Sequence, residues 1–193
     1  MFNDTSSPLS LLRTRRSARP RDLVEPGPDA TQLRQILEIA MRTPDHGKLH
    51  PWRFVHVPKA QRGAFASLLA RAYAAQRPDA GRLEIEANER FAHQAPELIA
   101  MLSTPVESQK IPRWEQELSA GAAMMNLLHA AHALGFAGGW VTGWVSESKL
   151  VLEALGGRDG DRIVGFVFVG TPGVPLEERP RPDFDEVVST WRP

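Results

Sequence analysis

Apolar positions along this chain follow two different periods, and the period predicts the type of each element. Residues 31–42 carry leucine, isoleucine and alanine at helical spacing, whereas WRFVHV and RIVGFVFVG are apolar runs of strand length. Helices are predicted from Pro8, with Ser7 as the cap, then over 31–42, within 58–93, over 113–134 and from Ser146; strands are predicted over 52–57, 97–104 and 162–170. Because strands alternate with helices, we expect a layered α/β or α+β fold.

The helix predicted at 113–134 is apolar on nearly every side. Beyond its first turns it consists mainly of alanine, methionine and leucine, and Gly135 ends it. Such a helix must be buried almost all round, either in the core of one domain or between two subunits. The second possibility also gives a place to the tail, residues 173–193, which is proline-rich yet carries Phe184 and Trp191. We therefore favour a homodimer with an extended tail, and we expect residues 1–6 to be mobile.

Composition limits the domain organisation and the partners. The 193 residues, 42% of them hydrophobic, suit one domain over the whole chain, 1–193. The chain has 23 basic residues (Lys and Arg) and 23 acidic residues (Asp and Glu), so no net charge attracts nucleic acid or an anionic membrane. There are no cysteines for thiol catalysis. The N-terminus lacks the apolar core of a secretory signal, and Asn126, His129 and His132 interrupt the most hydrophobic stretch. We expect a cytoplasmic protein without a membrane span.

Five arginines lie within nine residues at the end of the first predicted helix: Arg13, Arg15, Arg16, Arg19 and Arg21. One interpretation is a solvated basic surface, which the negative end of the helix dipole favours. The other is a phosphate site, because guanidinium groups match phosphate oxygens in a bidentate fashion, and Ser17 adds a hydroxyl donor. With no interleaved aromatic residues, the cluster gives little support for nucleic-acid binding.

The segment TPDHGKLHPW at 43–52 places two histidines four residues apart. On a helix they would share a face and suit a zinc ion, but Pro44, Pro51 and Gly47 predict a loop instead. A metal site is therefore a minor hypothesis. Asp45 suits a turn that its own side chain closes, and Trp52 is expected to begin the next strand by packing into the core.

A third segment, GFAGGWVTGW at 135–144, contains four glycines and two tryptophans. Glycine permits close backbone approach to a flat ligand, although a glycine-rich strand is more often a bend in a sheet. The segment does not match the GxGxxG motif of dinucleotide-binding proteins. In that motif a strand precedes the glycines and a helix follows them, whereas here the helix precedes the glycines. The chain also has no GxSxG, Walker or HExxH motif, so hydrolase, nucleotide triphosphatase and zinc protease functions have no motif support.

Taken together in order and spacing, five segments resemble the FMN-dependent nitroreductase family, and specifically its short bacterial branch of NAD(P)H nitroreductases. They are RRS at 15–17, MRTPDHGKLHPWRF at 41–54, IPRWEQELSAGAAMMNLL at 111–128, ALGFAGGWVTG at 133–143 and DRIVGFVFVGTP at 161–172. The resemblance runs from about Ser7 to Thr171. It implies an α+β fold with a central, mainly antiparallel sheet flanked by helices, and an intertwined homodimer with two FMN sites at its interface.

The resemblance also implies which residues bind FMN. The phosphate and the polar edge of the ring would be held by Arg15, Arg16 and Ser17, and the partner subunit's flavin would be reached by Arg42 and His46. The isoalloxazine would lie along Trp140, Val141 and Thr142, with a backbone N–H near Thr142 or Gly143 directed at N5. Many relatives have glutamate where this chain has Thr142. In the tail, Arg179 and Arg181 would add to the phosphate site.

A nicotinamide nucleotide contact is described in some relatives at the stretch that matches Ala130, Ala131, His132, Ala133, Leu134 and Gly135. The carboxyl end of a helix is a poor phosphate site, so this assignment has low weight. The implied chemistry passes a hydride from NAD(P)H to FMN and then to a nitroaromatic, a quinone or a similar acceptor. Because the flavin carries the hard chemistry, we expect no protein nucleophile or metal and assign no catalytic residue; either His46 or ordered water could supply a proton. The alternatives are a flavin enzyme of narrower purpose, such as a dehalogenase, a specific dehydrogenase or a flavin-cleaving oxygenase, and a non-enzymatic flavin-binding protein.

Overall fold

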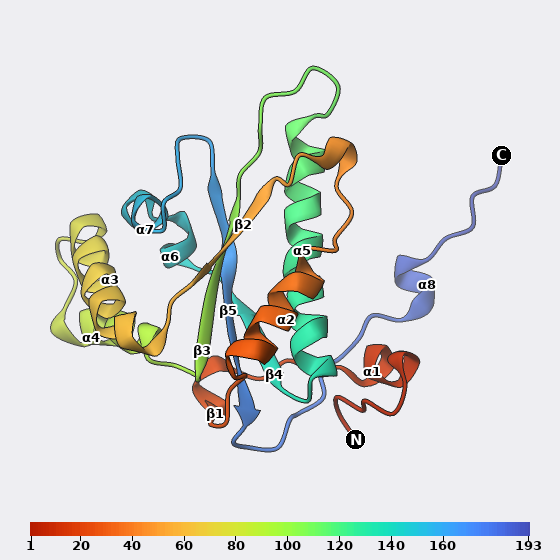
Figure 1. Ribbon diagram of the computed structural model, residues 1–193, viewed down its shortest axis with the longest axis horizontal. Helices are drawn as coiled ribbons and strands as arrows, with labels where there is room; N and C mark the ends of the chain where they lie inside the picture. Colours follow the sequence, from red (N-terminus) through yellow and green to blue (C-terminus); the bar gives the residue numbers. More distant parts are fainter.

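A five-stranded antiparallel sheet forms the centre of the computed structural model, which describes residues 1–193 (Figure 1). Its strands are β1 (Leu23–Val24), β2 (Trp52–His56), β3 (Glu97–Ser103), β4 (Ala137–Val141) and β5 (Arg162–Pro172). β5 lies in the middle and pairs with three strands: β3, β4 and, at its last two residues, β1. β2 pairs with β3 and forms one edge of the sheet.

Helices cover both faces of this sheet. They are α1 (Pro8–Thr14), α2 (Ala30–Ala40), α3 (Arg62–Gln76), α4 (Arg82–Ala92), α5 (Arg113–Ala133), α6 (Trp144–Glu147), α7 (Lys149–Ala154) and α8 (Phe184–Val187). Figure 1 shows α2 and α5 over one face, and α3, α4, α6 and α7 over the other. The expected α+β fold, with a mainly antiparallel sheet between helices, is confirmed. None of these helices has the length and apolar character needed to cross a membrane.

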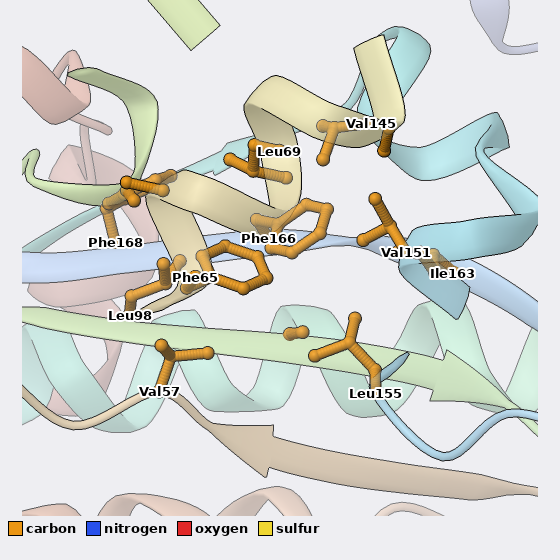
Figure 2. Close-up of a cluster of buried hydrophobic side chains, with 14 of the residues drawn as sticks. Val57, Phe65, Leu69, Leu98, Val145, Val151, Leu155, Ile163, Phe166 and Phe168 are labelled. Atoms are coloured by element: carbon orange, nitrogen blue, oxygen red, sulfur yellow. The ribbon is translucent and has the colours of Figure 1, made fainter. Parts of the chain in front are cut away.

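The two faces of the sheet bury different residues of the same strands. On β3, Leu98 and Leu102 belong to the cluster beneath α3 and α7, whereas Ile99 and Met101 pack beneath α2 and α5. Figure 2 shows the first cluster, in which Phe166 of β5 faces α3. Side chains alternate across a strand, so a sheet covered on both faces needs apolar residues at every position. This explains the continuous apolar runs that predicted β3 and β5.

Arg62 joins the α3–α4 hairpin to the sheet. Its guanidinium is buried and donates hydrogen bonds to four carbonyl oxygens, those of Val57, Ala92, Gln94 and Pro96, at 2.7–3.3 Å. The Ala92 carbonyl belongs to the last residue of α4, where the helix dipole favours a cation. The arginine therefore satisfies backbone groups that would otherwise be buried without partners.

Several boundaries differ from the prediction. The helix expected from Ser146 is two short helices, and Ser148, not Ser146, caps α7 by accepting a hydrogen bond from the Val151 N–H. The two-residue strand β1 was not predicted. Instead of lying free, the N-terminal segment is tied to the end of α1, since Asn3 exchanges hydrogen bonds with the backbone of Arg16. The tail is extended apart from α8, and Figure 1 shows it leading away from the rest of the chain.

Candidate functional site

The arginine-rich segment runs directly beside the glycine-rich strand. α1 begins at the predicted cap, Ser7, and ends at Thr14, after which residues 15–18 are extended. The Ala18 N–H then donates to the Gly138 carbonyl at 3.1 Å. A β-carbon at Gly139 would lie 2.5 Å from the Ala18 carbonyl oxygen, so glycine is required for this approach. The fold thus brings together two of the three segments singled out in the sequence.

A cationic pocket lies on the α5 side of this segment. It has a volume of about 460 Å³, and Arg13, Arg15, His129 and Arg181 line it, with Glu178 as the one carboxylate. Burial, and then the charges of Arg181 and Arg16, lower the pKa of the Arg15 guanidinium. The Arg15 Nε is buried without a hydrogen-bond partner, and its Nη2 donates to the Ser17 hydroxyl at 3.2 Å. An unpaired donor in a pocket with three arginines and one carboxylate fits an anion such as a phosphate.

The first part of the tail, before α8, contacts the same segment. The Arg16 Nε donates to the Glu177 carbonyl at 2.5 Å, which places Arg181 against the pocket. Glu178 accepts hydrogen bonds from the Arg179 backbone and, at 3.4 Å, from Arg181. Of the two tail arginines named from the sequence, Arg181 therefore lines the pocket, whereas Arg179 does not.

The strand β4 presents an open surface at its end. Trp140 is partly exposed, its indole N–H donates to the Val164 carbonyl at 3.2 Å, and Thr142 and Gly143 are exposed. Gly143 has a φ of 117°, and a β-carbon there would meet nothing within 4 Å. Backbone conformation, not lack of space, therefore demands glycine at this turn. This surface suits a flat ligand laid against an exposed backbone.

The loop 43–52 is held against the first half of α5. Its turn at His46–Lys48 contains Gly47 with a φ of 78°, and the Asp45 carboxylate accepts the Leu49 N–H at 2.6 Å. Ser119 of α5 donates to the Pro44 carbonyl at 2.9 Å. These contacts confirm the predicted loop, and Trp52 packs into the core as expected. The Asp45 carboxylate bonds the N–H four residues on, whereas the predicted Asx-turn would close on the backbone two residues on, so that part of the prediction is wrong.

His46 is paired with a carboxylate from α5. Its Nδ1 lies 2.7 Å from the Glu115 Oε1, and both side chains line a hollow of about 520 Å³. No local pattern predicts this pair, because the partners are 69 residues apart in the chain. Arg42, at the end of α2, is exposed.

The structure does not bring Arg42 and His46 to the cationic pocket. His46 contacts Glu115 at the start of α5, whereas His129 lines the pocket near the other end of the same helix. Fourteen residues of helix at 1.5 Å per residue separate these positions by about 21 Å. Within one subunit, the predicted site residues therefore form two separate groups.

The stretch matched to a nicotinamide contact is largely internal. Ala130, Ala131 and His132 are buried, and only Ala133, Leu134 and Gly135 have exposed or partly exposed surface. Both ring nitrogens of His132 lack hydrogen-bond partners. Burial, then the charges of Arg15 and His129, lower the pKa of His132 to about 4. Its imidazole is therefore neutral near pH 7.

Comparisons with known proteins agree with this fold. The nitroreductase family matches residues 12–171. The chain is 42% identical to "Putative NAD(P)H nitroreductase YdjA" of Escherichia coli (strain K12), over 85% of this chain and 87% of that protein. It is 40% identical to a "Putative NAD(P)H nitroreductase" of Haemophilus influenzae, over 89% of this chain and 91% of that protein.

Solved structures share the fold at lower identity. A nitroreductase-like protein from Bacillus cereus superposes with a TM-score of 0.78 at 22% identity, covering 96% of each chain. A nitroreductase with bound FMN from Bacteroides fragilis gives a TM-score of 0.71 at 20% identity, covering 97% of this chain and 100% of that one. With the family match over most of its length, this chain belongs to the nitroreductase family of enzymes.

Proposed function

We propose that this protein is an FMN-dependent oxidoreductase that passes electrons from NAD(P)H to a nitroaromatic, a quinone or a similar acceptor. The observation that carries the proposal is the cationic pocket, with its buried, unpaired Arg15 Nε, on the segment that runs beside β4 and bonds it at Gly138. The names of the Escherichia coli and Haemophilus influenzae relatives specify NAD(P)H, and the Bacteroides fragilis protein contains FMN.

In this proposal the chain's own residues bind and orient the flavin. Arg15 and Arg181, which line the cationic pocket, would hold the phosphate together with Arg16 and Ser17 of the adjoining segment, because these side chains supply hydrogen-bond donors and positive charge. Trp140, Val141 and Thr142 would lie along the ring, with the backbone at Thr142 or Gly143 towards its N5. The chemistry that bound FMN would supply is hydride transfer, which carries two electrons and a proton. The protein contributes position, hydrogen bonds and limited access to water.

We further propose that the flavin site is shared between two subunits of a homodimer. One face of α5 remains exposed in the single chain: Trp114 is 61% and Leu118 65% exposed, and Ala122, Met125 and His129 continue the same face. A symmetric interface places the first half of one α5 against the second half of its copy if the helices run antiparallel. Arg42 and His46 of one subunit then approach the cationic pocket of the other, which closes the 21 Å gap of the single chain.

The tail supports the same assembly. Phe184, Val187, Val188 and Trp191 are all exposed, although apolar side chains of this size are normally covered. Leu9 and Leu12 of α1 are also more than half exposed. A second copy of the chain provides a surface for both groups, as an intertwined homodimer would.

An absorbance spectrum tests the enzymatic proposal. Purified protein is mixed with FMN, freed of excess flavin and then treated with NADH or NADPH without oxygen. We expect a protein-bound flavin band that bleaches with one of the two nucleotides and returns when a quinone or nitroaromatic is added. A protein that binds FMN but is reduced by neither nucleotide would refute the oxidoreductase activity and leave only flavin binding.

A further inference from the structure

The pair formed by His46 and Glu115 has the geometry of a proton donor and its orienting carboxylate. The Nδ1 of His46 lies 2.7 Å from the Glu115 Oε1, and no other side-chain hydrogen bond is made by the imidazole. A carboxylate accepts a hydrogen bond, so an imidazole that bonds one through Nδ1 carries a proton on Nδ1, whether the ring is neutral or charged. For the neutral ring, this assigns the Nδ1–H tautomer. The Nε2 is then the atom free to hold or release a proton.

Glu115 is placed where its negative charge is favoured. It stands in the first turn of α5, the positive end of that helix dipole, and about two thirds of its side chain is buried. The imidazole is 62% exposed and lines the hollow of about 520 Å³. An exposed ion pair of this kind contributes little to stability, so the pairing acts mainly on orientation.

The surroundings leave this pair as the main titratable group of the hollow. Asp45 is the one other charged residue in its lining, and the Asp45 carboxylate already accepts the Leu49 N–H at 2.6 Å. Pro44, Leu118 and Ala122 supply apolar walls. A small aromatic acceptor fits such a surface better than a strongly charged ligand does.

We infer that Glu115 is a positioning residue that fixes His46 as the proton donor to the acceptor bound at the partner subunit's flavin. This inference rests on the proposed function and on the proposed sharing of the site. Reduction of a quinone to a hydroquinone takes up two electrons and two protons. The transferred hydride supplies both electrons and one proton, and the Nε2–H of protonated His46 supplies the second. The imidazole is left neutral and regains a proton from water.

The position of the proton on His46 gives a test that needs no turnover. ¹⁵N NMR of the FMN-loaded protein reports which ring nitrogen carries hydrogen, with His46→Gln used to assign the signals. We expect the Nδ1–H form in the wild type and its loss in Glu115→Gln. The matched control is Glu117→Gln, since Glu117 lies on the same helix and pairs with Arg113 instead. An Nε2–H tautomer in the wild type would refute the pairing.

The acceptor step gives the second test. Protein reduced without oxygen is mixed with a quinone or with ferricyanide, which takes electrons and no proton, and reoxidation is followed by stopped flow. We expect Glu115→Gln to slow the quinone reaction roughly tenfold or more, with ferricyanide rates within about twofold of the wild type. Glu117→Gln should alter neither rate.

Two results would overturn the proton-donor role: equal slowing with both acceptors, or unchanged quinone rates in Glu115→Gln. A wild-type protein that bound no FMN would overturn the proposed function together with this role. The NMR measurement on that flavin-free protein would still show whether Glu115 sets the tautomer of His46, so the two failures are distinguishable.

Discussion

Replacing Arg15 by methionine should weaken FMN binding without destabilising the flavin-free protein. In the free protein the Arg15 guanidinium is partly buried, its Nε has no partner, and its hydrogen bond to Ser17 is long at 3.2 Å. Burial and the neighbouring cations Arg181 and Arg16 lower its pKa, so the fold disfavours the charge that it holds there. Methionine keeps much of the side-chain volume and removes that charge.

The magnitude follows from the contact that is lost. A hydrogen bond to a charged group contributes about 1.5–3 kcal/mol, which corresponds to a rise in the Kd for FMN of roughly 10- to 150-fold. The free energy of unfolding of the flavin-free protein should change by less than about 0.5 kcal/mol, or increase, because no satisfied buried partner is removed. The two effects therefore separate a binding role from a structural role.

Two titrations measure these quantities. Quenching of FMN fluorescence gives the Kd, and urea unfolding without FMN gives the stability. Arg21→Met is the matched control, because Arg21 belongs to the same arginine-rich segment, is 70% exposed and does not line the pocket. An unchanged Kd for Arg15→Met, or an equal rise in Kd for Arg21→Met, would show that the cationic pocket does not hold the flavin phosphate.

Three further substitutions test the interface, a buried histidine and a buried arginine. Leu118→Lys should convert the proposed dimer to monomers in light scattering, because it places a charge in the exposed face of α5, whereas Leu83→Lys on α4 should not. His132 has a folded pKa of about 4 against 6.5 for the unfolded chain, so the unfolded state binds more protons between these values and stability falls as pH drops from 6.5 to 4. His132→Leu should remove about 3 kcal/mol of that loss in urea titrations at several pH values; an identical pH profile would contradict the assignment. Arg62→Met should lower the free energy of unfolding by about 3 kcal/mol or more, since four carbonyls lose a charged donor, and a loss below about 1 kcal/mol would refute this account.

Local signals in the sequence predicted much of the fold. Ser7 caps α1, apolar spacing locates α2, and the continuous apolar runs locate β3 and β5 close to their observed bounds. Short elements were harder. Two residues are too few for β1 to show a period, and Ser146 and Ser148 are equally good caps by residue type. In the structure Ser146 lies inside α6, and only Ser148 stands at the start of a helix.

The candidate site was predictable in parts but not as a whole. Its segments were recognisable by arginine, histidine and glycine content, and the resemblance assigned them to one flavin site. Pairings between distant residues, such as His46 with Glu115 and Thr43 with Asn126, depend on how α5 packs and leave no trace in local sequence. The single chain also keeps His46 and Arg15 apart, so the complete site depends on the proposed second subunit.

Mixing two damaged variants tests the shared site most directly. Arg15→Met and His46→Ala proteins, each weak in FMN binding, are unfolded together, refolded and titrated with FMN. In a mixed dimer, one site combines the intact Arg15 of one subunit with the intact His46 of the other. Random pairing should therefore restore wild-type affinity at about a quarter of all sites. Recovery of that fraction is the result we predict, and a mixture that binds no better than its two components would contradict a flavin site built from both subunits.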